Sequence, residues 1–193
     1  MNIPLQLILL SIPSVIYLAV QKRREKKWGE VLGQIGWKSS KLKYYLWSIG
    51  VVIFVVGLGW LALQLVPQDV LRDSNVSVSK YVEMTPSVAS FLLVWLREAI
   101  YVALGEEIFF RGFLGGWLTR RYGFAIGNAA QSLIFLLPHL LLLLVSMSFW
   151  PMVLVQMLAG WLLGWLRFQA NSILPGWFAH SLSNAIGALT TIV

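Results

Sequence analysis

The sequence predicts an all-α, polytopic integral membrane helical bundle with about six transmembrane helices. Of its 193 residues, 58% are hydrophobic and only 12% are charged, and the mean hydropathy is +0.74. This balance is far from that of a soluble domain. Apolar runs such as residues 46–66 reach the roughly 20 residues that a helix needs to cross a bilayer. Most charges fall between these runs, which separates the membrane segments from their polar connections.

Six apolar stretches make up the expected bundle. The first contains Pro4 and Pro13, which favour a kink, and basic residues follow it instead of preceding it, so we do not expect a cleaved signal peptide. The third is longer than a bilayer is thick, so we expect it to tilt, to break near Gly105 or to start as an interfacial segment. Pro151 and Pro175 indicate the starts of the last two helices. The stretches cover residues 3–20, 44–66, 87–118, 124–147, 151–167 and 172–192.

The connections predict an orientation. Eight of the fifteen basic residues lie in residues 21–43, and Arg120, Arg121 and Arg167 follow later stretches, whereas the acids and bases of residues 67–86 nearly balance. Basic loops face the cytoplasm under the positive-inside rule, so both termini are expected outside. We expect a bacterial cytoplasmic membrane as the location. The net charge of +7 is explained in this way without a nucleic-acid partner.

Small and aromatic residues also follow the membrane pattern. Three glycine pairs at four-residue spacing predict close helix packing: Gly112/Gly116, Gly123/Gly127 and Gly160/Gly164. The ten tryptophans fall mostly near the ends of the expected spans, as in an interfacial belt.

Acidic residues are rare in the apolar half, so Glu106 and Glu107 stand out. A charge at membrane depth costs about 2.5–3.5 kcal/mol or more, which favours a functional role. Glu107 and Arg111 are four residues apart and share a helix face, so they are expected to pair. Glu106 points about 100° away from that face. It is therefore the candidate free carboxylate and general base.

The two histidines of the chain complete the candidate site. Phe135 and His139 are four residues apart on one expected helix, and His180 and Asn184 are four apart on another. The imidazole and amide of the second pair could donate hydrogen bonds to a developing oxyanion. Each histidine taken alone could equally be a packing residue.

Several hydrolytic chemistries are excluded by composition. The chain has no cysteine, which removes thiolate nucleophiles and thiolate metal sites. Neither His139 nor His180 begins a His-Glu-x-x-His motif, and Asp69 and Asp73 both lie in the polar loop 67–86. A serine near the histidines stays open as a nucleophile, although no Gly-x-Ser-x-Gly turn surrounds one.

The motifs Glu106-Glu107-x-x-x-Arg111, Phe135-x-x-x-His139 and His180-x-x-x-Asn184 on successive helices resemble the CPBP family. This family includes type II CAAX prenyl endopeptidases and the bacterial Abi or bacteriocin-processing proteins. The resemblance covers about residues 87–193, which we expect to form a CPBP-like catalytic helical core. Residues 1–86, with two helices and loops, carry no motif of the family and are expected to be N-terminal membrane segments.

The resemblance implies an intramembrane endopeptidase that hydrolyses a membrane-associated or lipidated substrate. It implies that Glu106 and His139 activate a water, while His180 and Asn184 hold the oxyanion. Glu107 and Arg111 complete the expected catalytic set. We favour no cofactor, because Glu106, His139 and His180 could bind zinc but would then leave no obvious base.

The substrate is expected to be a peptide or membrane protein in the bilayer, with prenylation an open point. Two alternatives of other classes remain at this stage. One is a noncatalytic immunity or scaffold protein that keeps these residues for stability. The other is a proton-coupled carrier, which the small size and the lack of a duplicated half disfavour.

Overall fold

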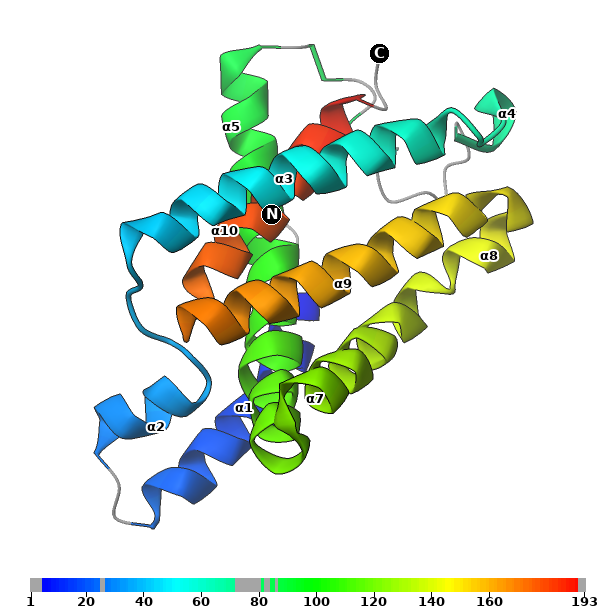
Figure 1. Cartoon of the computed structure of the whole chain (residues 1–193). Coiled ribbons are helices and arrows are strands. Elements are labelled where there is room, and N and C mark those ends of the chain that lie inside the picture. The colour runs from blue at the N-terminus through cyan, green and yellow to red at the C-terminus, as the bar shows by residue number, and fades with distance from the viewer. Residues whose placement is uncertain (1–4, 25–26, 72–80, 82–83, 86, 191–193) are drawn as a thin grey trace.

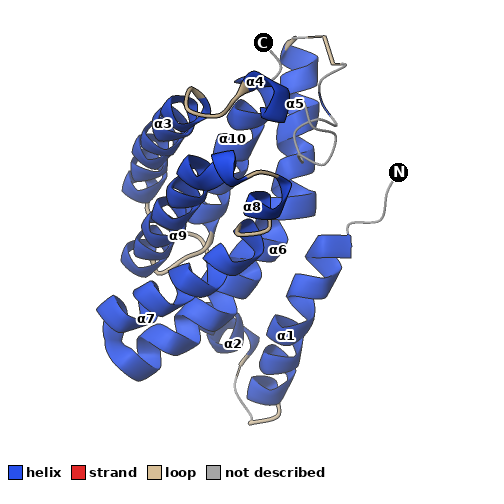
Figure 2. Ribbon diagram, turned by 90° about the vertical axis from the view of Figure 1, so that its right-hand side faces the viewer, coloured by secondary structure: helices blue, strands red, loops and turns tan. Residues whose placement is uncertain are grey.

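The computed structural model describes residues 5–24, 27–71, 81, 84, 85 and 87–190. It contains helices and no strand within these residues, which confirms the all-α bundle (Figures 1 and 2). Its helices are α1 (Leu5–Lys22), α2 (Trp28–Gln34), α3 (Leu42–Leu63), α4 (Gln68–Leu71), α5 (Val88–Arg97), η2 (Glu98–Ala103), α6 (Leu104–Glu106), η3 (Glu107–Gly115), α7 (Gly116–His139), α8 (Leu142–Val145), η4 (Met147–Phe149), α9 (Trp150–Ala170) and α10 (Leu174–Thr190).

Four helical stretches of the described chain are long and apolar enough to cross a membrane. They are Leu5–Lys22, Leu42–Leu63, Val88–Val145 and Met147–Ala170. The third stretch is 58 residues long and contains both the third and the fourth of the spans expected from the sequence. The sixth expected span corresponds to α10, which has 17 residues. The architecture is that of a polytopic integral membrane protein.

The long third stretch reverses direction at Gly123. This glycine has φ 78° and ψ 169°, far from helical values, and the chain turns back there within α7 (Figure 1). Gly127 then packs directly on the preceding arm, where an added Cβ would lie 2.6 Å from the backbone nitrogen of Thr119. The glycine pair Gly123/Gly127 therefore makes a tight turn instead of a contact between separate helices.

The arm before this turn contains two π-helical segments. Residues Glu98–Ala103 and Glu107–Gly115 form wider turns than an α-helix, separated by the short α6. π-helical turns are rare and frequently occur at functional sites. Both glutamates of the central motif lie where α6 meets the second of these segments, so the change in helical winding alters the directions in which their side chains point.

Helices α9 and α10 pack against this arm, and α3 packs against both of them. Helices α3, α9 and α10 share a core that contains the buried side chains of Val51, Val52, Leu163, Leu166 and Ala179. Helix α9 also lies against the second half of α7 (Figure 1). Gly160 and Gly164 permit this contact, since a Cβ on Gly160 would lie 2.9 Å from the ring of Phe135 and one on Gly164 would overlap Asn128. This glycine pair packs against a neighbouring helix, as expected.

Helix α1 lies along the other side of the long arm (Figure 2). The two helices approach most closely at Gly105, where a Cβ would lie 2.9 Å from Cα of Leu7. Ser14 donates a hydrogen bond to the carbonyl of Ile108 at 3.3 Å and extends the contact. The absence of a side chain at Gly105 therefore brings the start of α1 next to Glu106.

The basic connection 21–43 contains a short helix, α2, that the sequence analysis did not predict. Gly112 and Gly116 pack against its end: added Cβ atoms would lie 2.9 Å from the carbonyl oxygen of Ile35 and 3.1 Å from that of Gln34. This third glycine pair thus contacts a connecting segment and not a membrane helix.

Candidate active site

Glu107 forms the centre of a buried polar network. Its Oε1 lies 3.1 Å from Nη1 of Arg111 and 2.9 Å from Nδ1 of His180. The side chains of Glu107 and Arg111 are both 0% exposed. The structure thus contains the ion pair expected from their four-residue spacing. A buried charge needs such a partner, and here one carboxylate orients both a guanidinium and an imidazole.

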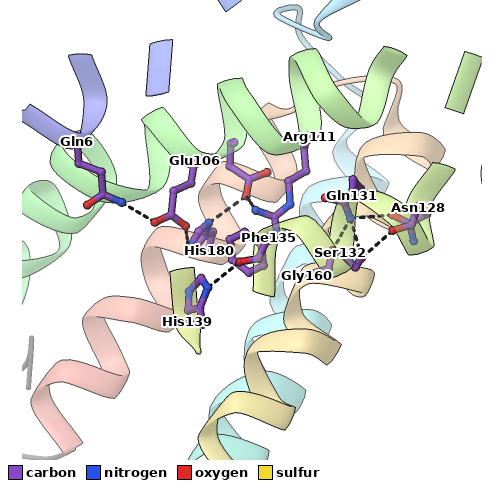
Figure 3. A network of polar contacts seen from close by, with 11 residues as sticks. Gln6, Glu106, Arg111, Asn128, Gln131, Ser132, Phe135, His139, Gly160 and His180 are labelled. Atoms are coloured by element: carbon purple, nitrogen blue, oxygen red, sulfur yellow. Dashed lines mark hydrogen bonds and ion pairs between the residues drawn. The ribbon is translucent and has the colours of Figure 1, made fainter. Parts of the chain in front are cut away.

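Glu106 lies on the other side of the His180 ring. Its Oε2 is 3.6 Å from Nε2 of His180, and its Oε1 accepts a hydrogen bond of 2.6 Å from Nε2 of Gln6. Gln6 and His180 reach it from opposite directions (Figure 3). Glu106 is therefore not paired with Arg111, as expected, but it has two other neighbours. The close approach of α1 at Gly105 is what brings Gln6 within reach.

His180 lies between the two carboxylates, with one ring nitrogen toward each. With Nδ1 donating to Glu107, a neutral ring would present the lone pair of Nε2, whereas a doubly protonated ring would present a second donor. Helix α10 carries this histidine and is held to the arm by Trp177, whose Nε1 donates to the carbonyl of Ala99 at 2.8 Å. The bond to Glu107 and the attachment of α10 through Trp177 together fix the position of His180.

His139 lies beside this network at the end of the long α7 arm. Its Nδ1 is 2.8 Å from the carbonyl oxygen of Phe135. Because a carbonyl only accepts, Nδ1 carries the proton and Nε2 is the free basic nitrogen. The ring of Phe135 packs 4.5 Å from that of His139 and 6.2 Å from that of His180. The Phe135-x-x-x-His139 motif thus supplies both a histidine and an aromatic ring that contacts both imidazoles (Figure 3).

Asn184 belongs to a neighbouring polar cluster. Its Nδ2 donates to Oε2 of Glu98 at 3.3 Å, and the hydroxyl of Tyr81 donates to Oε1 of the same carboxylate at 2.6 Å. Burial, followed by the hydrogen bond to Glu98, raises the pKa of Tyr81, so the phenol keeps its proton. One N–H of the Asn184 amide is used in this contact and the second is available for a ligand.

An apolar cavity of about 220 Å³ joins these groups to the interior of the bundle. His180, Asn184, Glu98 and Phe135 line one part of its wall, and mostly apolar side chains, many of them from α3 and α9, line the rest. The cavity can hold an apolar group next to the hydrogen-bond donors of α10. Ser183 also lines it.

The residues singled out from the sequence therefore fall into three connected groups. Four of them form one buried network: Glu106, Glu107, Arg111 and His180. His139 adjoins it through the Phe135 ring, and Asn184 faces the adjoining cavity.

Two residues that contact this set were not predicted from the sequence. Gln6 bonds to Glu106, and Tyr81 bonds to the carboxylate that holds Asn184. A glutamine in an otherwise apolar first span was a usable signal. No periodicity linked Tyr81 to its partner, because it lies outside the helices of the core.

A metal centre would need several metal-ligating side chains close together. Within the described residues, no group of three or more His, Cys, Asp or Glu side chains lies close enough to hold a metal ion. His139 uses Nδ1 for the Phe135 carbonyl, and both nitrogens of His180 face carboxylates. Because histidines that bind metals also donate their other ring N–H to a carbonyl or carboxylate, these contacts do not decide between zinc and no zinc, and a reaction without metal stays a prediction.

The fold and this network define a polytopic membrane protein in which a buried glutamate–arginine–histidine network adjoins an apolar cavity through His180. The model of the family described as type II CAAX prenyl endopeptidase Rce1-like matches residues 88–186. The chain belongs to this family, which confirms the resemblance and places it among the CAAX-type intramembrane proteases. Comparisons with curated proteins and with solved structures gave no match.

Proposed function

We propose that the protein hydrolyses a peptide bond of a membrane-associated substrate with a water activated by Glu106 and His139. The observation that carries the proposal is the position of His180, held between two buried carboxylates at the wall of the apolar cavity. A substrate carbonyl entering this cavity meets the donors of α10 beside the base Glu106.

The proposed reaction gives each group of this network one role. Glu106, assisted by Nε2 of His139, takes a proton from water as its oxygen attacks the carbonyl carbon. The carbonyl oxygen becomes an oxyanion that His180 and Asn184 stabilise by hydrogen bonds.

Collapse of this tetrahedral intermediate breaks the carbon–nitrogen bond. The proton taken from water passes from Glu106 or His139 to the leaving amine, so the products are a carboxylic acid and an amine. Glu98 and Tyr81 act as positioning residues: their contacts fix the Asn184 amide so that its second N–H points at the developing charge.

We favour a reaction without a metal because each residue of the site then has a single role. If Glu106 were a zinc ligand, Glu107 would be the remaining acid of the motif, and it already binds Arg111 and His180. The proposed location is a bacterial cytoplasmic membrane, with the basic connection 21–43 in the cytoplasm.

For the substrate we propose a chain whose apolar part enters the cavity while its scissile bond lies at His180 and Asn184. A prenylated tail is one such substrate, and the apolar lining supports it. A leader peptide or a membrane-spanning regulator would use the same hydrolytic centre. Cleavage of a farnesylated peptide and of its unprenylated counterpart by the purified protein distinguishes these cases.

The test of the mechanism is Asn184→Ala assayed on a substrate that the wild type cleaves. Losing one oxyanion donor should lower kcat by about 10²–10³-fold, while KM stays close to the wild-type value because the cavity wall is otherwise intact. Ser183→Ala, which alters the same wall without removing a proposed donor, is the matched control. An Asn184→Ala enzyme with wild-type kcat would refute the assignment.

A further inference from the structure

A second cavity, of about 730 Å³, lies on the far side of Arg111 from His180, between α2, α7 and α9. Four basic side chains line it, from four different parts of the chain: Lys38, Arg111, Arg120 and Arg167. Glu30 is the acidic side chain among its described lining residues, and Glu107 already neutralises Arg111. The charges of Lys38, Arg120 and Arg167 exceed that of Glu30 by two, so the cavity wall is positively charged.

Buried polar atoms in this wall have unused hydrogen-bonding capacity. Arg111 is fully buried, yet its Nε and Nη2 make no hydrogen bond within the described structure, and neither does Nε of Arg167. Such buried donors are rare, because each costs about 1–3 kcal/mol when unsatisfied. Gln131, which donates to Asn128, Ser132 and the Gly160 carbonyl (Figure 3), has a buried Oε1 without a donor.

Two of the lining arginines also bind the end of α2. Nη1 of Arg120 donates to the carbonyl of Gln34 at 3.0 Å, and Nη2 of Arg167 donates to the same carbonyl at 3.4 Å. Each guanidinium has five N–H groups, so both keep donors for a ligand. Helix α2 thus forms one wall of the cavity and the membrane helices form the others.

The surroundings place this cavity at the level of lipid headgroups. Trp28 is 56% exposed and Trp37 is 42% exposed, and each is adjacent in sequence to a lining residue, Gly29 and Lys38 respectively. Exposed tryptophans of membrane proteins concentrate at the interface between hydrocarbon and water. The basic connection 21–43 that contains them is the segment expected in the cytoplasm.

We propose that this cavity binds the phosphate of an anionic phospholipid headgroup. Basic pockets between membrane helices on the cytoplasmic side are suited to such headgroups. Phosphate is favoured over carboxylate because the cations approach from several directions, and a tetrahedral phosphate accepts from several directions whereas a carboxylate accepts in one plane. The volume accommodates a whole headgroup, and Oε1 of Gln131 can accept from a headgroup hydroxyl such as those of glycerol.

The proposal is tested by thermal unfolding of the full chain purified in a neutral detergent. The probes are dihexanoylphosphatidylglycerol, dihexanoylphosphatidylcholine and inorganic phosphate, with sodium chloride matching the ionic strength. Binding to the folded state raises the unfolding midpoint in a concentration-dependent manner. We expect the phosphatidylglycerol to raise it at concentrations where the zwitterionic lipid and chloride do not.

Matched variants locate the effect. Lys38→Gln, at an exposed lining position, and Lys38→Gln/Arg120→Gln should raise the half-saturating concentration of phosphatidylglycerol by about tenfold or more, because a charge-assisted contact is lost. Lys41→Gln/Arg121→Gln removes the same charge from neighbouring positions outside the cavity and should change it less than twofold. The comparison uses the ligand-induced shift, so a lower starting stability of Arg120→Gln does not obscure it.

The outcomes separate the two sources of phosphate. If inorganic phosphate is as effective as the lipid and shows the same dependence on Lys38, the site stands and its ligand is a free phosphate. If the lining and control variants respond alike, or phosphatidylcholine matches phosphatidylglycerol, the proposed site is wrong.

Discussion

At the scale of single residues, the adjacent glutamates have different partners and therefore different expected sensitivities. Glu107 binds Arg111 and His180, and its removal leaves a fully buried guanidinium without its counter-charge. Glu106 contacts Gln6 and His180 at the edge of the network. Under the proposed mechanism, Glu107 supports the structure of the network and Glu106 transfers the proton.

We predict that Glu106→Gln abolishes cleavage while the protein stays nearly as stable as the wild type. Glutamine keeps the shape and the contact with Gln6 but cannot take a proton. Glu107→Gln should lose activity and also about 3–5 kcal/mol of stability, the usual cost of breaking a buried pair. Turnover and thermal unfolding of the two purified variants check this; substantial turnover by Glu106→Gln means that another group is the base.

A second prediction at this scale concerns metal. Because Glu106 is assigned to the water, the purified enzyme should contain well under one equivalent of zinc and should stay active after exhaustive chelation. Elemental analysis and an assay before and after chelation measure both. Stoichiometric zinc whose removal stops cleavage and whose return restores it would instead make the histidines ligands.

The residues predicted from the sequence were those with a chemical reason to be conspicuous in an apolar chain. Charged side chains at membrane depth are conspicuous because burying them costs free energy. Each histidine is conspicuous because it lies four residues from Phe135 or Asn184, on the same helix face. Gln6 and Tyr81 could not be placed in this way, because their partners lie on other elements and depend on packing. The His180 contacts with both glutamates also escaped prediction, since helical spacing relates residues within one helix only.

At the scale of elements, the contact between α7 and α9 depends on Gly164, which faces Asn128 and Gln131. Gly164→Ala should cost about 1–3 kcal/mol of stability, since the new methyl group must displace these buried side chains. Gly57→Ala is the control: nothing lies within 4 Å of its added Cβ, so alanine should be neutral or stabilising there. Thermal unfolding of both variants in detergent provides the comparison, and equal midpoints would contradict the packing.

The helical class and the family could be predicted from apolar runs and motif spacing, but the winding of the helices could not. The π-helical segments η2 and η3 arise within a continuous helical arm whose residues have no special composition. The short α2 was missed because a charged connection gives little hydrophobic periodicity. The glycine pairs were noticed, yet only the structure distinguishes a turn from a helix contact.

At the scale of the whole molecule, the orientation in the membrane remains a prediction from charge. Cysteines introduced at Ser39, in the basic connection, and at Asp69, in α4, should react with membrane-impermeant reagents from opposite sides, the first from the cytoplasm. Both positions are exposed and the chain has no cysteine of its own. Labelling in intact cells and in inverted vesicles measures this, and reaction of both from one side would contradict the orientation.

The turn at Gly123 sets a register between the two arms that it joins. Glu107 and His139 each lie sixteen residues from it in sequence, so the two arms measure out similar lengths, about 20–25 Å at helical rise. The equal arm lengths of this helical hairpin therefore place Glu107 and His139 at comparable depth. One residue inserted into either arm would shift its end by about 1.5 Å and rotate it by about 100°, which would move Glu107 or His139 out of its place in the site without altering either side chain.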